Sequence, residues 1–300
     1  MIKIGIIGVG YFGEKHLENI LSLKKIFNIV GIYDKNQQKS QEISRKYNTN
    51  SFNSIDALVQ HCDAINITSS TNSHYEIIKF CVKKNKHIFI EKPISEKIEE
   101  ITEIRKITQG YKKIIQIGFI ERFNDAFLSL LLLNFSIKKI KALRTGLIND
   151  RNKNSCIIQD MMIHDIDIIN YIIASYISNI SIKKESTKNK VICKLTFENN
   201  CIAEIKAERS KLISREKSER KIMIYTQNNE QIILDLLNRK IYLNQKELNK
   251  KIENSNPLKS ELIHFHNCIK NGKKNEISIQ SGYESGLIAS EINKKLNELL

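Results

Sequence analysis

Lys92 stands between the end of a short apolar run, closed by Glu91, and a proline, Pro93. Because proline restricts the residue before it to extended backbone, the amine of Lys92 leaves the chain in a defined direction. An amine held in this way can stabilise the negative charge that forms on an alcohol oxygen when its proton leaves. A lysine considered alone is usually a solvated surface residue. Its place at the end of a strand favours a catalytic role here.

Asp160 and His164 form a second candidate pair. They are four residues apart at the start of a segment with helical period, so their side chains share one face. A carboxylate can orient an imidazole and stabilise its charged form, which would let His164 accept a proton from a hydroxyl group. Two other interpretations stay open, a solvated or capping pair and a metal site. We predict no metal, because the sequence nearby lacks a convincing third ligand.

A glycine pattern, GVGYFG, begins at Gly8 directly after an apolar run and opens a segment of helical period. This context is typical of a dinucleotide-binding turn. Gly8 permits the tight turn, Gly10 lets a pyrophosphate approach the backbone, and Gly13 allows close packing of the helix. The first N–H groups of that helix, at Tyr11 and Phe12, can then bind the phosphates. The alternative is a glycine turn with a structural role only.

Asp34 ends the second apolar run, where a carboxylate can accept hydrogen bonds from both adenosine ribose hydroxyls. A 2'-phosphate at this place would meet like charge, so Asp34 favours NAD over NADP as the cofactor. Lys35, the next residue, would soften that repulsion. The alternative is that Asp34 only caps the following helix.

A polar segment follows the third apolar run, at the sheet edge where ligands bind in open α/β sheets. Its candidate cofactor contacts are Thr68, Ser69, Asn72 and His74, with Glu91 at the end of the next strand. The same side chains can equally serve as caps for the helix that begins near His74.

Arg122 lies where the pattern of the first part of the chain ends, in the segment GFIERFN. Its guanidinium can bind a carboxylate or phosphate in bidentate fashion, which makes it a candidate substrate contact. Phe119 and Phe123 can line the wall of a substrate site, although such aromatic side chains more often belong to the core.

Hydrophobic periodicity predicts the elements that position these residues. Up to about Gly118, short apolar runs alternate with helical segments, which is typical of a parallel sheet covered by crossover helices. The strands expected there are 4–7, 29–33, 64–68, 87–90 and 114–118, and the helices include 41–47, 75–83 and 98–107.

The later part of the chain has longer alternating segments, which predict a mostly antiparallel sheet. We expect strands at 140–146, 180–184, 191–197, 202–208, 222–226, 231–234 and 240–243, and helices at 123–133, 158–173, 258–269 and 285–299. The predicted fold is α/β, with an NAD-binding Rossmann domain over 1–118 and a substrate and oligomerisation domain over 119–300. The C-terminal helices can pack back on the first domain.

Length and composition narrow the class of protein. With 300 residues, 41% of them hydrophobic, the chain can bury the cores of two domains. The net charge of +15 is spread along the chain and can attract anionic small molecules, but no module specific for nucleic acid is recognisable. Six scattered cysteines, no leader-like N-terminus and no long apolar stretch predict a cytoplasmic protein without a membrane partner.

Together these motifs resemble the Gfo/Idh/MocA oxidoreductase family over nearly the whole chain. The matching segments are GVGYFG at 8–13, Asp34, Thr68 with His74, EKP at 91–93, GF-x-x-RF at 118–123 and D-x-x-x-H at 160–164. The resemblance implies a Rossmann domain joined to an α/β domain whose large sheet makes a homodimer or homotetramer. It also implies that Lys92 is the catalytic lysine, Asp160 the substrate-site carboxylate and His164 the acid/base histidine.

The segments GFIERFN and DMMIHDIDI look like the subgroup that oxidises the 3-hydroxyl of UDP-N-acetylhexosamines. The function expected from this resemblance is NAD-dependent oxidation of a sugar secondary alcohol to a ketone. The alternatives are an inositol or simple-sugar dehydrogenase and a non-catalytic regulatory protein that senses dinucleotide and sugar. The chain departs from the family at Ser70 and Asp125, where proline is usual, and at Ser155-Cys156, where glycines are common, so the loops around the substrate can differ in shape.

Overall fold

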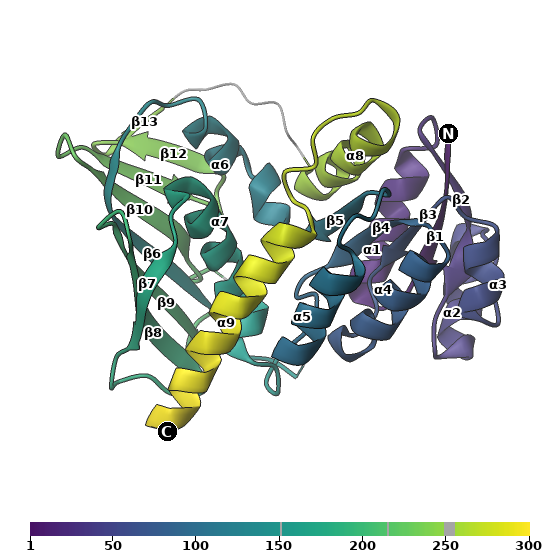
Figure 1. Cartoon of the computed structure of the whole chain (residues 1–300), viewed down its shortest axis with the longest axis horizontal. Coiled ribbons are helices and arrows are strands. Elements are labelled where there is room, and N and C mark those ends of the chain that lie inside the picture. Colours follow the sequence, from purple (N-terminus) through teal and green to yellow (C-terminus); the bar gives the residue numbers. More distant parts are fainter. Residues whose placement is uncertain (151, 215, 249–255) are drawn as a thin grey trace. The chain divides into compact units, whose positions relative to one another are not determined.

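The computed structural model describes residues 1–150, 152–214, 216–248 and 256–300 (Figure 1). The chain folds as two compact units. The first unit consists of Met1–Phe119 and Asn256–Glu284, and the second of Ile120–Ser255 and Ser285–Leu300. The long helix α9, Ile279–Leu299, contributes residues to both.

A five-stranded parallel sheet of order β2-β1-β3-β4-β5 forms the centre of the first unit (Figure 1). Its strands are β1 Ile2–Ile7, β2 Phe27–Tyr33, β3 Ala64–Ile67, β4 His87–Glu91 and β5 Ile115–Gly118. Helices cover both faces of such a sheet, which explains why these strands are near-continuous apolar runs. The strand order reverses direction at β1, so the carboxyl ends of β1 and β3 flank the switch point where ligands bind in this architecture.

The helices of the first unit follow the strands in alternation. They are α1 Tyr11–Ser22, α2 Gln37–Tyr47, α3 Ile55–Gln60, α4 His74–Lys83 and α5 Ile98–Ile107, with a 3₁₀ turn at Thr71–Ser73. Late in the chain, α8, Pro257–Lys270, returns to this unit and contacts α1. Phe265 of α8 packs edge-on against Phe89 of β4, with ring centroids 5.8 Å apart. A segment distant in sequence therefore completes the core beneath the sheet.

The second unit contains an eight-stranded sheet of order β13-β12-β11-β10-β6-β9-β8-β7. Its strands are β6 Ile137–Leu147, β7 Ile177–Ile182, β8 Lys190–Phe197, β9 Ile202–Ser210, β10 Arg220–Thr226, β11 Gln231–Asp235, β12 Lys240–Leu243 and β13 Lys246–Glu247. Neighbouring strands pair antiparallel except β6 and β9, which run parallel. The predicted fold class is confirmed.

Helices α6, Asp125–Leu130, and α7, Ile163–Ile173, lie on one face of this sheet (Figure 1). Along β9 the residues that face them, such as Ala203 and Ile205, are buried, while the alternate residues are partly exposed. This alternation is typical of a sheet with one core face.

Two helices predicted as continuous are interrupted. The segment predicted as helix 123–133 is a 3₁₀ turn, Ile120–Phe123, followed by α6, because the side chain of Asn124 caps α6 by accepting from the N–H of Ala126 at 3.1 Å. The segment predicted as helix 158–173 begins with a π-helical turn, Ile158–Met162, before α7. The short helix α3 was not predicted, since six residues are too few for a periodic pattern. Among the described helices, none is both long and apolar enough to cross a membrane.

Candidate active site

The glycine turn joins β1 to α1. Gly8 has φ of +92°, and a Cβ there would collide with the backbone of Ser69. A Cβ on Gly13 would collide with the carbonyl oxygen of Gly8, so the helix can approach the turn only with glycine at this position. At Gly10 a Cβ would meet nothing within 4 Å, and no side chain caps α1. This open backbone at a helix N-terminus fits the pyrophosphate of a dinucleotide.

Asp34, just after β2, is hydrogen-bonded to the backbone of the glycine turn. One oxygen of its carboxylate accepts from the N–H of Val9 at 2.8 Å and the other from the N–H of Asn36 at 2.9 Å. Asn36, rather than Asp34, is the N-cap of α2, because its side chain accepts from the N–H of Lys39. Each carboxylate oxygen has a second lone pair that can accept a ribose hydroxyl. The alternative of Asp34 as the helix cap is therefore wrong.

The polar segment after β3 makes hydrogen bonds within the unit. Thr68 Oγ1 donates to the carbonyl of Gly8 at 2.7 Å, which ties the ends of β1 and β3 together. Ser69 and Ser73 are hydrogen-bonded through their hydroxyls at 2.7 Å, and Ser70 Oγ donates to Asn72 Oδ1. Contact of Thr68, Ser69 and Asn72 with a cofactor remains a prediction, as does that of Tyr11 and Phe12, whose side chains are more than half exposed.

Lys92 lies between two anchored neighbours. On one side, Glu91 Oε1 is 2.9 Å from Nε2 of the buried His16. On the other, the carbonyl of Pro93 is 2.9 Å from Nδ1 of His74. The peptide bond between Lys92 and Pro93 is cis. The neighbours of Lys92 are thus each bound by an imidazole, Glu91 through its side chain and Pro93 through its carbonyl.

His74 is buried and lies between two carbonyl groups, Pro93 O and Ser69 O, the latter 3.1 Å from Nε2. Burial lowers the pKa of His74, although both carbonyls act in the opposite direction. A neutral imidazole has one N–H, so it donates to one of the two carbonyls. His74 therefore links the segment after β3 to the one after β4, and its contact with a cofactor stays a prediction.

Three polar residues of this region were missed at the sequence level. Nδ2 of Asn66 lies 2.9 Å from Nδ1 of His16, which leaves the His16 proton on Nε2, facing Glu91. Glu261 of α8 is fully buried, and burial together with the charge of Glu91 raises its pKa well above the ordinary value. The signal available in the sequence is a polar residue inside an otherwise apolar pattern, as Asn66 is in β3.

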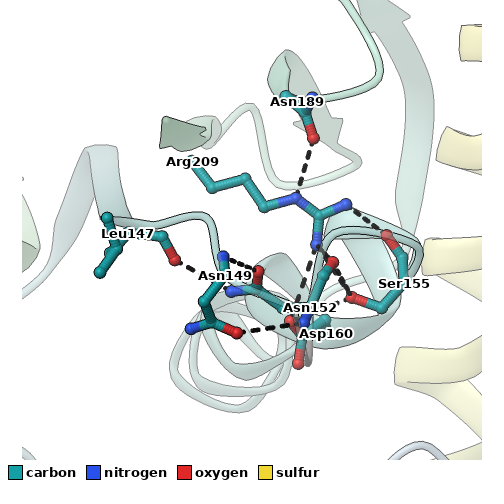
Figure 2. Close-up of polar contacts among 7 residues, drawn as sticks. All are labelled: Leu147, Asn149, Asn152, Ser155, Asp160, Asn189 and Arg209. Atoms are coloured by element: carbon teal, nitrogen blue, oxygen red, sulfur yellow. Dashed lines mark hydrogen bonds and ion pairs between the residues drawn. The ribbon is translucent and has the colours of Figure 1, made fainter. Parts of the chain in front are cut away.

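In the second unit, Asp160 lies in the π-helical turn and His164 in the first turn of α7. Such π turns are often found at functional sites. The Asp160 side chain is 37% exposed, with Oδ2 3.3 Å from Ser155 Oγ and 3.9 Å from Arg209 Nη1 (Figure 2). His164 is partly buried.

Two buried ion pairs hold α7 next to His164. Asp165 accepts from Arg144 Nε and Nη2 at 2.9 and 2.8 Å, and Arg144 also donates to Glu121 at 3.1 Å. Burial raises the pKa of Asp165, while Arg144 acts in the opposite direction. Asp167 accepts from Arg122 Nε and Nη2 at 2.5 and 2.9 Å. The helix start that carries His164 is therefore bound to β6 and to the 3₁₀ turn before α6.

The guanidinium of Arg122 makes its contacts with residues of the second unit. Besides Asp167, it stacks on the ring of Tyr171, with the guanidinium carbon 3.8 Å from the ring centroid, and only 7% of the residue is exposed. Phe119 in the first unit is 1% exposed. Substrate contact by Arg122 or Phe119 remains a prediction.

The candidate residues are divided between the units. The glycine turn, Asp34, His74 and Lys92 belong to the first, and Asp160 and His164 to the second. Within the described ranges, no cluster of three or more histidine, cysteine or carboxylate side chains is arranged to hold a metal ion.

Comparison with known proteins finds dehydrogenases among the curated relatives of this chain. The chain is 27% identical over 168 residues to a UDP-N-acetylglucosamine 3-dehydrogenase of Acidithiobacillus ferrooxidans, a match that covers 56% of this chain and 53% of that protein. It is 28% identical over 194 residues to a myo-inositol 2-dehydrogenase of Thermotoga maritima, covering 60% of this chain and 57% of that protein. In these matches the chain spans little more than half the length of either relative.

A solved structure of the Acidithiobacillus ferrooxidans UDP-N-acetylglucosamine 3-dehydrogenase superposes with a TM-score of 0.91. The match covers 100% of this chain and 99% of that one at 22% sequence identity, and so shows a shared fold. Residues 2–119 match the model of an oxidoreductase family with an NAD-binding Rossmann fold. The predicted resemblance to the Gfo/Idh/MocA oxidoreductase family is confirmed over residues 2–119, which contain the glycine turn, Asp34 and Lys92, whereas Asp160 and His164 lie beyond the matched residues.

Proposed function

We propose that this protein is an NAD-dependent dehydrogenase that oxidises a secondary alcohol of a sugar to a ketone, at C3 of a UDP-N-acetylhexosamine. The observation that carries the proposal is the double anchoring of Lys92, by His16 through Glu91 and by His74 through Pro93. An amine whose two neighbours in the chain are both bound in this way is suited to hold charge at one place, which is the main contribution of a protein to such a reaction.

The first unit would hold the cofactor. Gly8, Gly10 and Gly13 leave backbone open to a pyrophosphate, and the Asp34 carboxylate can accept the ribose hydroxyls. When bound, the nicotinamide supplies a hydride acceptor. The negative charge of Asp34 supports NAD over NADP, since a 2'-phosphate would lie against it.

His164 would accept the proton of the substrate hydroxyl, and Lys92 would hold its positive charge beside the oxygen as the negative charge develops. Asp160 would orient His164. Alignment of these groups on the substrate would contribute much of the rate enhancement.

A panel of substrates tests the proposal. UDP-N-acetylglucosamine, UDP-N-acetylgalactosamine, UDP-glucose, myo-inositol and glucose are each offered with NAD and with NADP, and reduced nicotinamide is followed by its absorbance. Turnover with a UDP-N-acetylhexosamine and NAD, and formation of the 3-keto sugar, are expected. Tight binding of cofactor and sugar without turnover on any substrate would contradict an enzymatic role and favour a regulatory one.

An inositol or simple sugar is the second candidate substrate class, because a myo-inositol 2-dehydrogenase is among the relatives at nearly the same identity. The panel separates the two. A preference for myo-inositol over every UDP-sugar would select this alternative.

The oligomeric state and location form part of the same proposal. The sheet of the second unit has a partly exposed face, with Lys141, Met223 and Tyr225 among its side chains, and this face can pair two copies of the chain as a homodimer or homotetramer. Light scattering coupled to gel filtration measures the state. All six cysteines are thiols, which agrees with a reducing, cytoplasmic environment.

A further inference from the structure

Arg209 lies near the end of β9, where it is paired with Gly146 of β6. Its side chain is 2% exposed, and every nitrogen of its guanidinium has a partner (Figure 2). Nε donates to Asn189 Oδ1 at 2.9 Å. Nη1 donates to the carbonyl of Asn152 at 2.6 Å and to Ser155 Oγ at 2.9 Å, and Nη2 donates to the carbonyl of Ser155.

These partners are neutral, and burying a cation among neutral groups alone costs free energy of folding. Burial indeed lowers the pKa of Arg209, and the charge of Asp160 acts in the opposite direction. The carboxylate of Asp160 lies 3.9 Å from Nη1. Arg209 therefore binds the segment before the π-helical turn and, at the same time, faces the acidic residue within that turn.

Ser155 connects the two charged groups. Its hydroxyl accepts from Arg209 Nη1 and lies 2.9 Å from the carbonyl of Asn152 and 3.3 Å from Asp160 Oδ2. One hydroxyl has one proton, for which the Asn152 carbonyl, which also accepts from Arg209, and the Asp160 carboxylate compete, and a charged acceptor forms the stronger hydrogen bond. With the proton on the Asp160 side, the chain of contacts runs from Arg209 through Ser155 to Oδ2, which restricts rotation of the carboxylate.

We propose that Arg209 is a positioning residue, which sets the orientation of the Asp160 carboxylate through the hydroxyl of Ser155. The inference rests on the proposed function, in which Asp160 meets the substrate and orients His164. Ser155 stands where the family resemblance leads one to expect glycine, which has no hydroxyl to make this link. The connection is therefore a feature of this chain's own substrate site.

A double-mutant cycle tests whether Arg209 acts through Asp160. Arg209→Gln should lower kcat/KM for UDP-N-acetylglucosamine about 10- to 100-fold, because small misplacements of reacting groups have effects of this size. The KM for NAD should stay unchanged. Ser155→Ala should give a smaller loss of the same kind, and Arg209→Lys should recover part of the activity. The matched control Lys206→Ala breaks a more exposed ion pair with Glu208 on the same strand and should leave kcat/KM within about twofold.

In the Asp160→Asn background, Arg209→Gln should change kcat/KM by less than about twofold, since coupled residues are not additive. The same fold loss in both backgrounds would overturn the proposal and leave Arg209 with a purely structural role. Melting temperatures identify a variant that fails to fold. If Arg209→Gln fails to fold, Ser155→Ala, which keeps the Arg209 contacts to backbone carbonyls, replaces it in the double-mutant cycle with Asp160→Asn.

Crystal structures give a readout that does not depend on turnover. The Asp160 carboxylate should rotate in Ser155→Ala and in Arg209→Gln relative to the unmodified protein. An unchanged carboxylate in both variants would overturn the inference. If no sugar is oxidised, the proposed function fails, while the orientation of Asp160 still decides the role of Arg209.

Discussion

The imidazole of His16 lies 2.9 Å from the carboxylate of Glu91, the residue directly before Lys92. His16 belongs to α1 and Glu91 ends β4, so the helix that would receive the phosphates also holds the strand end that carries the candidate catalytic amine. His16 is fully buried, and Asn66 sets the position of its proton. One hydrogen bond thus connects the dinucleotide turn with the position of Lys92.

Replacing His16 by leucine should therefore affect both stability and catalysis. The Glu91 carboxylate and the Asn66 amide would lose a buried partner, which costs about 1–3 kcal/mol of the free energy of unfolding. With the strand end less restrained, kcat should fall about tenfold. Chemical denaturation and steady-state kinetics measure the two effects. A variant that loses stability but keeps its kcat would show that the His16–Glu91 hydrogen bond does not position Lys92.

Lys92→Ala and His164→Ala should each reduce kcat by about 10²- to 10⁴-fold, because each removes a group that acts on the reacting oxygen. The affinity for NAD, measured by calorimetric titration, should stay largely intact. Lys97→Ala and His61→Ala, at exposed positions of the first unit, are the matched controls and should keep full turnover. Full turnover in the Lys92 and His164 variants would remove these residues from the mechanism.

Asp34→Asn should raise the use of NADP relative to NAD by about tenfold, which corresponds to about 1.4 kcal/mol of relieved repulsion. The amide keeps an acceptor for only one of the N–H groups of Val9 and Asn36, which now bond to different oxygens, so the comparison uses the ratio of the two cofactors rather than the absolute rate. Lys35→Ala should act in the other direction and lower the use of NADP. The measurement is the ratio of kcat/KM with NADP to kcat/KM with NAD. A ratio that stays the same in both variants would show that other residues determine the cofactor preference.

Loss of one partner of the buried Arg122–Asp167 ion pair should strongly destabilise the second unit. Asp167→Asn leaves a buried guanidinium without its countercharge, and the free energy of unfolding should fall by about 3–5 kcal/mol. The double variant Arg122→Met with Asp167→Leu should be less destabilised than the single one, because no unpaired charge remains. Lys97→Ala, which breaks the exposed pair with Glu100, should shift the unfolding midpoint far less.

His87 should make the stability of the first unit depend on pH. Its Nδ1 accepts from the N–H of Ile114 at 3.0 Å, and burial, with a smaller effect of Lys113, lowers its pKa from 6.5 to about 4. Between these pH values the unfolded chain binds the proton more readily, so the contribution of His87 is complete above pH 6.5 and is lost as pH falls towards 4. Denaturation midpoints across this range should fall less steeply with acid in His87→Gln, and equal slopes would contradict the assignment.

Several features were decided by local physics and could be predicted from the sequence. The glycine turn, the apolar strands and the change to alternating segments near Gly118 depend on residues close together in the chain, which is why the fold class is confirmed. The resemblance to the family over residues 2–119 depends on the motifs of that stretch. Periodicity also predicted a helix at 158–173, but it did not distinguish a π-helical turn at Ile158–Met162 from a regular one.

Only the tertiary structure decided which charged and polar groups meet. His16 and Glu91 are 75 residues apart, Arg122 and Asp167 are 45, and Arg209 and Ser155 are 54. No periodic pattern encodes such pairs, because a side chain's partner depends on how sheets and helices pack rather than on its neighbours in the chain. The candidate catalytic residues were accessible to sequence reasoning through their motifs, whereas the residues that hold them in place became visible only when distant segments were brought together.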